Sequence, residues 1–318
     1  MKCSYAENEL LKKAISTSLT ATSFAANADR QYCLSLTQNG LLQIKPLIIS
    51  AHAPTVKSNL SLFSLHEHTI NLINPQQQLL TLHRYGSGLS PMGWVLKTND
   101  FDVIKSRLAN GHLTITQQIN GDLILGDIRL SYNTHICHMT VKRRLHTQLD
   151  KTAIRQRFMQ LDYPTGLFGF LRENIVDNPA PELVILCERL NRLMLGQHAD
   201  ITQFIGLGPG LTPSLDDIIV GMIAVLVSDH RFKPKIQQLK TAMLALPLET
   251  LTTTISATFL KYALQGQFSL SVLDVIERLN QHQYDHCAIH NLLNYGHTSG
   301  ADLLLGIWLG IDRFVIKD

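Results

Sequence analysis

The sequence lacks the features that would mark an exported or membrane-bound protein. Its longest apolar runs, at 218–227 and 303–310, are roughly half as long as a bilayer span requires. The first ten residues include two glutamates and no apolar segment of signal-peptide length. We therefore expect a cytoplasmic protein with no membrane contact.

The sequence also lacks a marked excess of charge of either sign, and it lacks closely spaced cysteine pairs. The 28 basic and 25 acidic residues give a net charge of +3, and the longest basic run is Lys142-Arg143-Arg144. This distribution does not favour a nucleic-acid partner. The five cysteines are odd in number, scattered and without a C-x-x-C pair, which argues against a disulfide framework or a structural zinc site.

The length and the periodicity of the chain predict two domains of different class. A chain of 318 residues, 45% hydrophobic, exceeds the length at which a single core usually divides. From residue 31 to about 141, short alternating runs rich in β-branched residues are separated by Asn-Gly and Gly-Ser-Gly turns, and after about 150 the apolar period becomes helical. The sequence predicts an α+β protein, with a β-rich domain (antiparallel sheet or barrel) at 1–150 and a mostly helical domain at 151–318. The clearest strands are expected at 41–49, 68–73, 112–118 and 123–130, and helices at 154–161, 181–195, 214–227, 235–246, 254–264, 270–279 and 288–295.

The segment Gly206-Leu207-Gly208-Pro209-Gly210 is a loop that leads into a helix. Its glycines allow sharp turns and leave backbone amides accessible. Ser214, followed three residues later by Asp217, has the spacing of a capping box with Ser214 at the N-cap. Amides and the positive end of the helix dipole converge at such a start, which suits phosphate or carboxylate. The loop is neither a Walker loop nor a dinucleotide fingerprint, because no lysine follows it and Leu211 stands at the third glycine position.

Asp216 and Asp217 give this expected anion site two adjacent carboxylates. They could hold a Mg²⁺ ion that bridges to the ligand, act as a base, or only cap the helix and neutralise its dipole. The sequence leaves these alternatives open. No metal ligands are assigned, and Mg²⁺ is the one cofactor that the pattern allows.

A second helix start repeats the first. Ser299-Gly300-Ala301-Asp302, three leucines and Gly306 reproduce the serine, aspartate, aliphatic and glycine spacing that ends at Gly221. Glycine inside an apolar helix is destabilising unless another segment packs closely against it. We expect the two helices to cross at Gly221 and Gly306 with both N-termini facing one pocket; duplicated packing without a ligand is the alternative.

Other polar residues complete the list of candidates. The cluster at 252–256 offers hydroxyls that either line the same pocket or cap a helix. His297, just before Thr298, could act as an acid or base or only cap the preceding turn. The catalytic candidates are Asp216, Asp217, Asp302 and His297, and the ligand-binding candidates are Gly208, Gly210, Thr212, Ser214, Thr254, Ser256, Thr298, Ser299 and Gly300.

The segments GLGPGLTPSLDD at 206–217 and GHTSGADLL at 296–304 resemble a bacterial family first described as a domain of unknown function, with the characteristic string G-x-G-x-G-L-T-P-S-G-D-D. That family includes the AllH (YlbF-like) subunit of oxamate carbamoyltransferase. The resemblance covers most of residues 200–310. It implies a three-subunit assembly with an FdrA-like partner that converts oxalurate and phosphate to oxamate and carbamoyl phosphate in ureide and purine (allantoin) breakdown. Leu215 stands where the family has glycine, and a side chain there would narrow the ligand space.

Our first hypothesis is therefore a subunit of a carbamoyltransferase-type complex that binds a small anionic substrate. One alternative is a stand-alone Mg²⁺-dependent kinase or hydrolase, since sugar kinases and ADP-ribosyl hydrolases share aspartates at helix starts. The other is a non-catalytic scaffold subunit that needs these helix starts only for packing.

Overall fold

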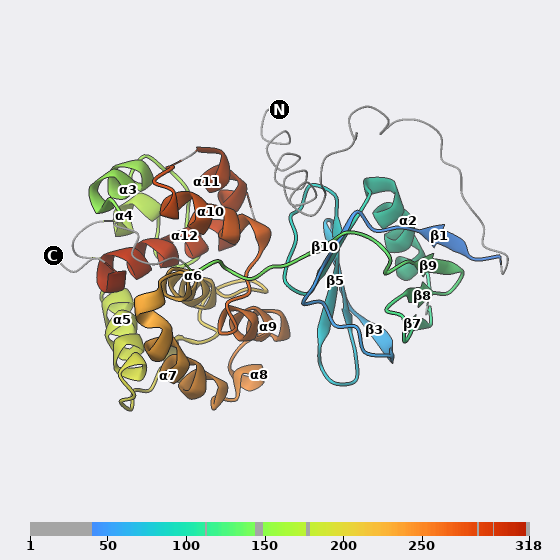
Figure 1. The fold of residues 1–318 in the computed structure, drawn as a ribbon, viewed down its shortest axis with the longest axis horizontal. Helices are drawn as coiled ribbons and strands as arrows, with labels where there is room; N and C mark the ends of the chain where they lie inside the picture. The colour runs from blue at the N-terminus through green and yellow to red at the C-terminus, as the bar shows by residue number, and fades with distance from the viewer. Residues whose placement is uncertain are drawn as a thin grey trace. The chain divides into compact units, whose positions relative to one another are not determined.

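The computed structural model describes residues 40–111, 113–143, 149–175, 179–284, 286–294 and 296–315. The chain divides into two units, Met1–Met139 and Thr140–Asp318 (Figure 1). The division assigns 140–150, expected in the first domain, to the second unit. A β-rich first unit and a mostly helical second unit confirm the predicted α+β class. Cys3, Cys33 and the predicted β-rich residues 31–39 lie outside the described residues.

The described part of the first unit forms a ten-stranded sheet curled into a half-barrel, in the order β1-β9-β8-β7-β3-β4-β5-β6-β2-β10. Three neighbouring pairs are parallel, namely β1 with β9, β5 with β6 and β2 with β10; the other pairs are antiparallel. The strands are β1 (Leu42–Ile44), β2 (Ile48–Ser50), β3 (Ser58–Leu65), β4 (Thr69–Ile73), β5 (Leu79–Arg84), β6 (Gly93–Leu96), β7 (Ile115–Gln117), β8 (Leu123–Leu125), β9 (Ile128–Leu130) and β10 (Ile136–Cys137).

Two predicted strands are each divided in the structure. The expected strand at 41–49 becomes β1 and β2, because Pro46 between them has no N–H for a sheet hydrogen bond. The expected strand at 123–130 is the hairpin β8–β9, turned at Gly126 with φ +58°. The sequence analysis also missed α2 (Thr98–Ala109), which packs Phe101 and Ile104 into the core of this unit.

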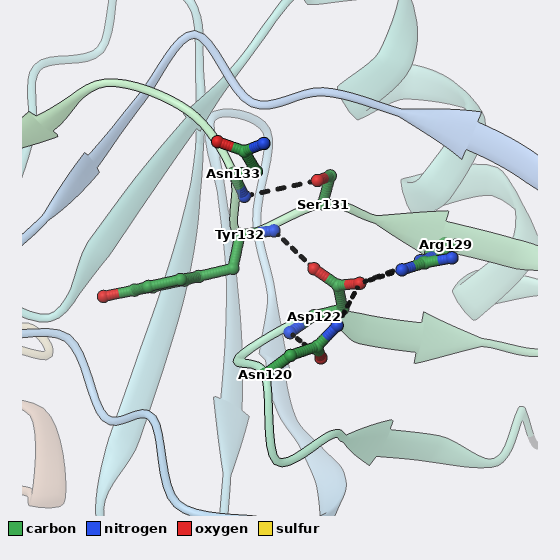
Figure 2. Close-up of polar contacts among 6 residues, drawn as sticks. All are labelled: Asn120, Asp122, Arg129, Ser131, Tyr132 and Asn133. Carbon is green, nitrogen blue, oxygen red and sulfur yellow. Dashed lines mark hydrogen bonds and ion pairs between the residues drawn. The ribbon is translucent and has the colours of Figure 1, made fainter.

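Asp122 links the β7–β8 turn by hydrogen bonds to β9 and to the residues that follow β9 (Figure 2). Its carboxylate accepts hydrogen bonds from Arg129 Nε at 2.8 Å, Tyr132 N at 2.7 Å and Asn120 Nδ2 at 2.9 Å. Burial raises the pKa of Asp122, but these hydrogen bonds outweigh burial and leave the pKa below its ordinary value. The adjacent Gly121, at φ +88°, lies so close to the Tyr132 ring that a Cβ would sit 2.6 Å from Cγ.

The second unit is built around two buried helices, α6 (Ser214–Ser228) and α12 (Ser299–Gly310), with its other helices around them (Figure 1). The surrounding elements include α3 (Lys151–Phe158), α4 (Leu171–Asn174), α5 (Pro181–Met194), α7 (Lys233–Leu244), α8 (Leu248–Leu251), α9 (Thr254–Ala263), α10 (Leu270–Asn280) and α11 (His286–Leu293). Every residue of α6 is buried, which explains why its sequence is apolar over almost its whole circumference. None of the helices in the described residues is both long enough and apolar enough to cross a membrane.

The two central helices cross at their internal glycines, as predicted. A Cβ on Gly221 would lie 2.2 Å from Leu303 O, and a Cβ on Gly306 would lie 2.1 Å from Ile218 O. These atoms belong to the backbone and cannot move aside by a side-chain rotation. Only glycine permits this approach, which brings the first turns of α6 and α12 together.

Candidate functional site: two paired helix starts

Helix α6 begins one residue earlier than the capping-box spacing predicts. Pro213 is the N-cap, with φ −55° and ψ 143°, and no side chain caps the helix. The Pro213 carbonyl accepts from Asp216 N at 3.0 Å and from Asp217 N at 3.2 Å. The prediction of Ser214 as the N-cap is therefore wrong: proline already has the required φ, and Ser214 is the first helical residue. Asp217 lies in the fourth helical position, and Asp302 has the same position in α12, whose N-cap is Thr298.

The glycine-rich loop folds tightly over the start of α6. Gly208 adopts φ +129°, and a Cβ there would lie 2.4 Å from Ser214 N. Gly206, at φ +79°, would place a Cβ 2.1 Å from Leu251 O. Leu215 N donates back to Leu207 O at 3.1 Å. The glycines are thus required both by backbone conformation and by close packing.

Asp216 holds the loop and α9 onto α6. Its Oδ1 accepts from Gly206 N at 2.8 Å, and its Oδ2 accepts from Thr252 Oγ1 at 2.5 Å and Ser256 Oγ at 2.6 Å. Burial raises the pKa of Asp216, and these three hydrogen bonds lower it in part. Both carboxylate oxygens thus have partners within the protein, and Thr253 caps α9 by accepting from Ser256 N at 3.1 Å. Capping, one of the two roles considered for the threonine-rich cluster, therefore occurs at Thr253, while the Thr252 and Ser256 hydroxyls donate to Asp216.

Asp217 and Asp302 bring two acidic groups into the space between the helix starts. Both residues are buried, with 5% and 0% of their surface exposed. Burial raises the pKa of Asp217 well above its ordinary value; the hydroxyls of Ser299 and Thr212 lower it, and the neighbouring Asp302 raises it further. Thr212 Oγ1 and Ser299 Oγ are 2.7 Å apart and join the two starts directly.

A third segment, the turn at Gly166, also contacts the two helix starts, and the sequence analysis missed it. Gly166 N donates to both carboxylate oxygens of Asp302, at 3.1 and 3.2 Å. A Cβ on Gly166 would lie 1.9 Å from Ser214 Oγ. Burial raises the pKa of Asp302 to about 6, and the Gly166 amide with the Ser214 and Thr298 hydroxyls offsets part of that effect. The Pro164-Thr165-Gly166 turn was the available signal, but nothing local connects it to a residue so distant in sequence.

Two family models match this chain. The model described as oxamate carbamoyltransferase subunit AllH matches residues 204–311, which contain both helix starts, and the AllH family N-terminal domain matches residues 49–137. Together they cover well over half of the chain. The chain belongs to the AllH family. No solved structure matches it.

The AllH match covers two buried polar atoms at the helix starts that lack hydrogen-bond partners among the described residues. They are Ser214 Oγ and Asp217 Oδ2. Ser214 lies near the Asp302 carboxylate but does not meet hydrogen-bond geometry there. Leaving such an atom unsatisfied costs about 1–3 kcal/mol. A ligand with its own polar groups would satisfy both atoms.

For the remaining candidates, no contact among the described residues joins them to the buried polar atoms at the helix starts. Gly210 adopts φ +91° in the exposed loop, and Thr254 begins α9 with its carbonyl accepting from Thr258 Oγ1 at 2.7 Å. His297 is exposed in the turn before α12, and Gly300 packs so that a Cβ would lie 2.0 Å from Leu292 O. Within the described ranges, no group of three or more His, Cys, Asp or Glu side chains could hold a metal ion.

Proposed function

We propose that this AllH-family chain binds a small anion carrying a carbamoyl or ureido group at the paired starts of α6 and α12. In this proposal the chain is a cytoplasmic subunit of a complex, with FdrA-like and other subunits, that converts oxalurate and phosphate to oxamate and carbamoyl phosphate in ureide and purine nitrogen breakdown. The observation that carries the proposal is the pair of buried atoms without partners, Ser214 Oγ and Asp217 Oδ2, between two helix N-termini.

The helix starts supply hydrogen-bond donors for the anionic end of such a ligand. No hydrogen bond among the described residues uses the amide N–H of Ser214 or Ser299. Both amides belong to the first residue of a long helix, where the helix dipole favours negative charge. The Ser214 hydroxyl adds a third donor beside them. Phosphate or carboxylate therefore fits this end of the site.

Burial makes the acids less unfavourable to an anion, because it favours their uncharged forms. The pKa of Asp217 is raised well above its ordinary value by burial, and the protonated carboxyl can donate a hydrogen bond. Asp302, with a pKa of about 6, is mainly ionised at pH 7 and accepts the Gly166 N–H. A carbamoyl group presents both a carbonyl acceptor and N–H donors, which a mixture of protonated and ionised carboxyls can match. Neither pairing requires a metal ion.

Ligand-induced stabilisation of the purified chain tests the proposal. Thermal unfolding would be measured with phosphate, carbamoyl phosphate, oxamate and oxalurate, each with and without Mg²⁺. A ligand at 100 times its Kd adds about 2.7 kcal/mol, which raises Tm by roughly 5–10 °C for a unit of this size. Ser214→Ala should remove most of the shift, because it removes a donor without breaking a described hydrogen bond.

The matched control is Ser228→Ala at the other end of α6, where the hydroxyl donates to Val225 O at 2.7 Å. This variant should lose some stability and keep the full ligand shift. A wild-type chain that none of the four compounds stabilises would contradict the proposal and favour the scaffold. ADP with Mg²⁺ is tested as a further ligand. If it stabilises the chain and the four compounds do not, the result would contradict the proposal and favour a kinase.

A further inference from the structure

The Ser214 hydroxyl at the paired helix starts is closed off from solvent. Ser214 is 1% exposed, and its Oγ is buried without a hydrogen-bond partner among the described residues. The neighbouring Asp302 is fully buried as well. A ligand can therefore reach the Ser214 hydroxyl only when one of the segments that cover it moves aside.

The turn that contains Gly166 is one of these covers. Gly166 lies directly against Ser214, because a Cβ on Gly166 would be 1.9 Å from Ser214 Oγ and 3.2 Å from Ser214 Cβ. Within the described part of the chain, the hydrogen bond from Gly166 N to the Asp302 carboxylate is the one that ties residues 164–170 to a distant segment. Phe168 packs partly buried against the helical core, and Leu167 at the tip is 41% exposed. Few contacts thus hold the turn down.

The same turn has a firm structure of its own. Thr165 donates to Gly169 O through both its N–H and its hydroxyl, each at 2.8 Å. At the base, Leu171 is fully buried and its N–H donates to Tyr163 O at 2.9 Å. The Tyr163 hydroxyl lies 3.1 Å from His290 Nδ1 in α11. The turn can therefore move as a unit about an anchored base and retain its internal hydrogen bonds.

The glycine-rich loop is the other cover, and it is held more firmly. Gly208 of this loop lies against Ser214, since a Cβ there would be 2.4 Å from Ser214 N. Hydrogen bonds tie the loop and the residues after it to α6, to α12 and to the start of α9, namely Gly206 N to Asp216, Leu215 N to Leu207 O, Thr212 Oγ1 with Ser299 Oγ, and Thr253 Oγ1 to Leu211 O. Moving this loop breaks several hydrogen bonds, whereas moving the Gly166 turn breaks one.

We infer that residues 163–171 form a lid, which is closed in this structure and lifts from Asp302 to admit a small anion to Ser214. The inference rests on the proposed function for its ligand, whereas the movement can be tested without a ligand. Since the ligand binds only the open state, its apparent affinity is reduced by the fraction of chains that are open. A variant that cannot close should therefore bind more tightly.

A cysteine at position 214 reports whether the lid is open. The reporter is the full chain with Ser214→Cys, treated with iodoacetamide and followed by mass spectrometry of the peptide that contains residue 214. Gly166 does not have a positive φ, so Gly166→Val is compatible with the turn itself and collides only with the helix starts. If about 10% or fewer of the chains are open beforehand, adding Gly166→Val should raise the alkylation rate at residue 214 roughly tenfold or more.

Two controls separate lid opening from unfolding. Leu167→Val alters the exposed tip of the same turn and should leave the rate at residue 214 unchanged. The native Cys187 is buried in α5, with its Sγ 3.9 Å from Met222 Sδ of α6. Its alkylation in the same samples reports opening of the helical core and should stay slow in every variant.

The outcomes separate the lid from the proposed function. The lid would be overturned if Gly166→Val leaves the rate at residue 214 unchanged, or if the rate at Cys187 rises equally, because the whole unit would then be opening. With Ser214 intact, Gly166→Val should also bind oxalurate roughly tenfold more tightly in calorimetric titration. Binding of oxalurate with unchanged affinity would overturn the lid and leave the proposed function standing. Faster alkylation in a chain that binds none of the four compounds would support the lid and overturn the proposed function.

Discussion

Replacing Gly306 by alanine tests the helix crossing on which the paired helix starts depend. The new methyl group would lie 2.1 Å from Ile218 O and 2.8 Å from Ile218 C. Alanine in place of a helical glycine gains about 1 kcal/mol of intrinsic helix stability. Overpacking a well-packed core costs about 1–3 kcal/mol, and here the contacts are with backbone atoms, so α12 itself must move. We therefore expect a cost at or above the upper end of that range, and a net loss of about 2 kcal/mol or more.

The two tryptophans allow the measurement to be made on the correct unit. Trp308 is buried in α12 and Trp94 is buried in the first unit, and the sequence contains no other tryptophan. In a Trp94→Phe background, Trp308 fluorescence during urea and thermal unfolding reports on the helical unit. The loss should appear as a Tm lower by roughly 4–8 °C.

Gly310→Ala in the same helix provides the control. A Cβ there would meet Val225 Cβ at 3.1 Å and the Met222 backbone at 3.3 Å, contacts that a shift of a few tenths of an ångström would relieve. Its stability should stay within about 1 kcal/mol of the wild type, because helix propensity and crowding nearly cancel. The reasoning would be refuted by a Gly306→Ala chain as stable as Gly310→Ala, since the backbone approach would then impose no requirement for glycine.

Three further substitutions test individual carboxylates. Asp122→Asn should lower the stability of the first unit by about 2 kcal/mol at pH 7, because it weakens the hydrogen bonds from Arg129. Since folding lowers the pKa of Asp122, the stability difference between variant and wild type in urea titrations should disappear as the pH falls below about 4. The pKa of Asp302 in the folded protein is about 6, above its unfolded value, so ionisation of this buried carboxyl destabilises the fold. As the pH falls from 7 to 4, the stability of the wild type should rise by up to about 3 kcal/mol relative to Asp302→Asn. A stability difference that does not change with pH would contradict this effect of burial. Ser256→Ala should cost about 1–3 kcal/mol in thermal unfolding, because Asp216 loses a donor at 2.6 Å; an unchanged Tm would show that this bond does not hold α9.

Local patterns were enough to predict much of the helical unit. Apolar periodicity placed α6, the repeated Ser-x-x-Asp pattern placed the start of α12, and the internal glycines Gly221 and Gly306 predicted that the two helices cross. The N-cap of α6 was missed by one residue, because proline and serine are both compatible with a helix start and the spacing alone favoured Ser214. Which residue caps is decided by the path of the preceding loop over the helix.

Contacts between distant segments could not be predicted in this way. Gly166 reaches the site through a turn of ordinary loop composition, and no local pattern links that turn to Asp302. The structural role of Asp216 could not be predicted either. In the sequence Asp216 and Asp217 are equivalent candidates, whereas in the fold the Asp216 carboxylate accepts hydrogen bonds from three donors in two segments.

This chain departs from the family string at Leu215, and the packing around the two helix starts shows why a side chain fits there. Leu215 is the second residue of α6, and its side chain is fully buried in the hydrophobic core of the helical unit. Its counterpart in the repeat, Gly300, lies against the backbone carbonyl of Leu292, where a side chain has no room. Leucine is thus accommodated at the first start and excluded at the second. Because the Leu215 side chain packs into the core, it should leave the space between the helix starts open, and Leu215→Gly should lower the stability of the helical unit without widening the range of ligands that bind.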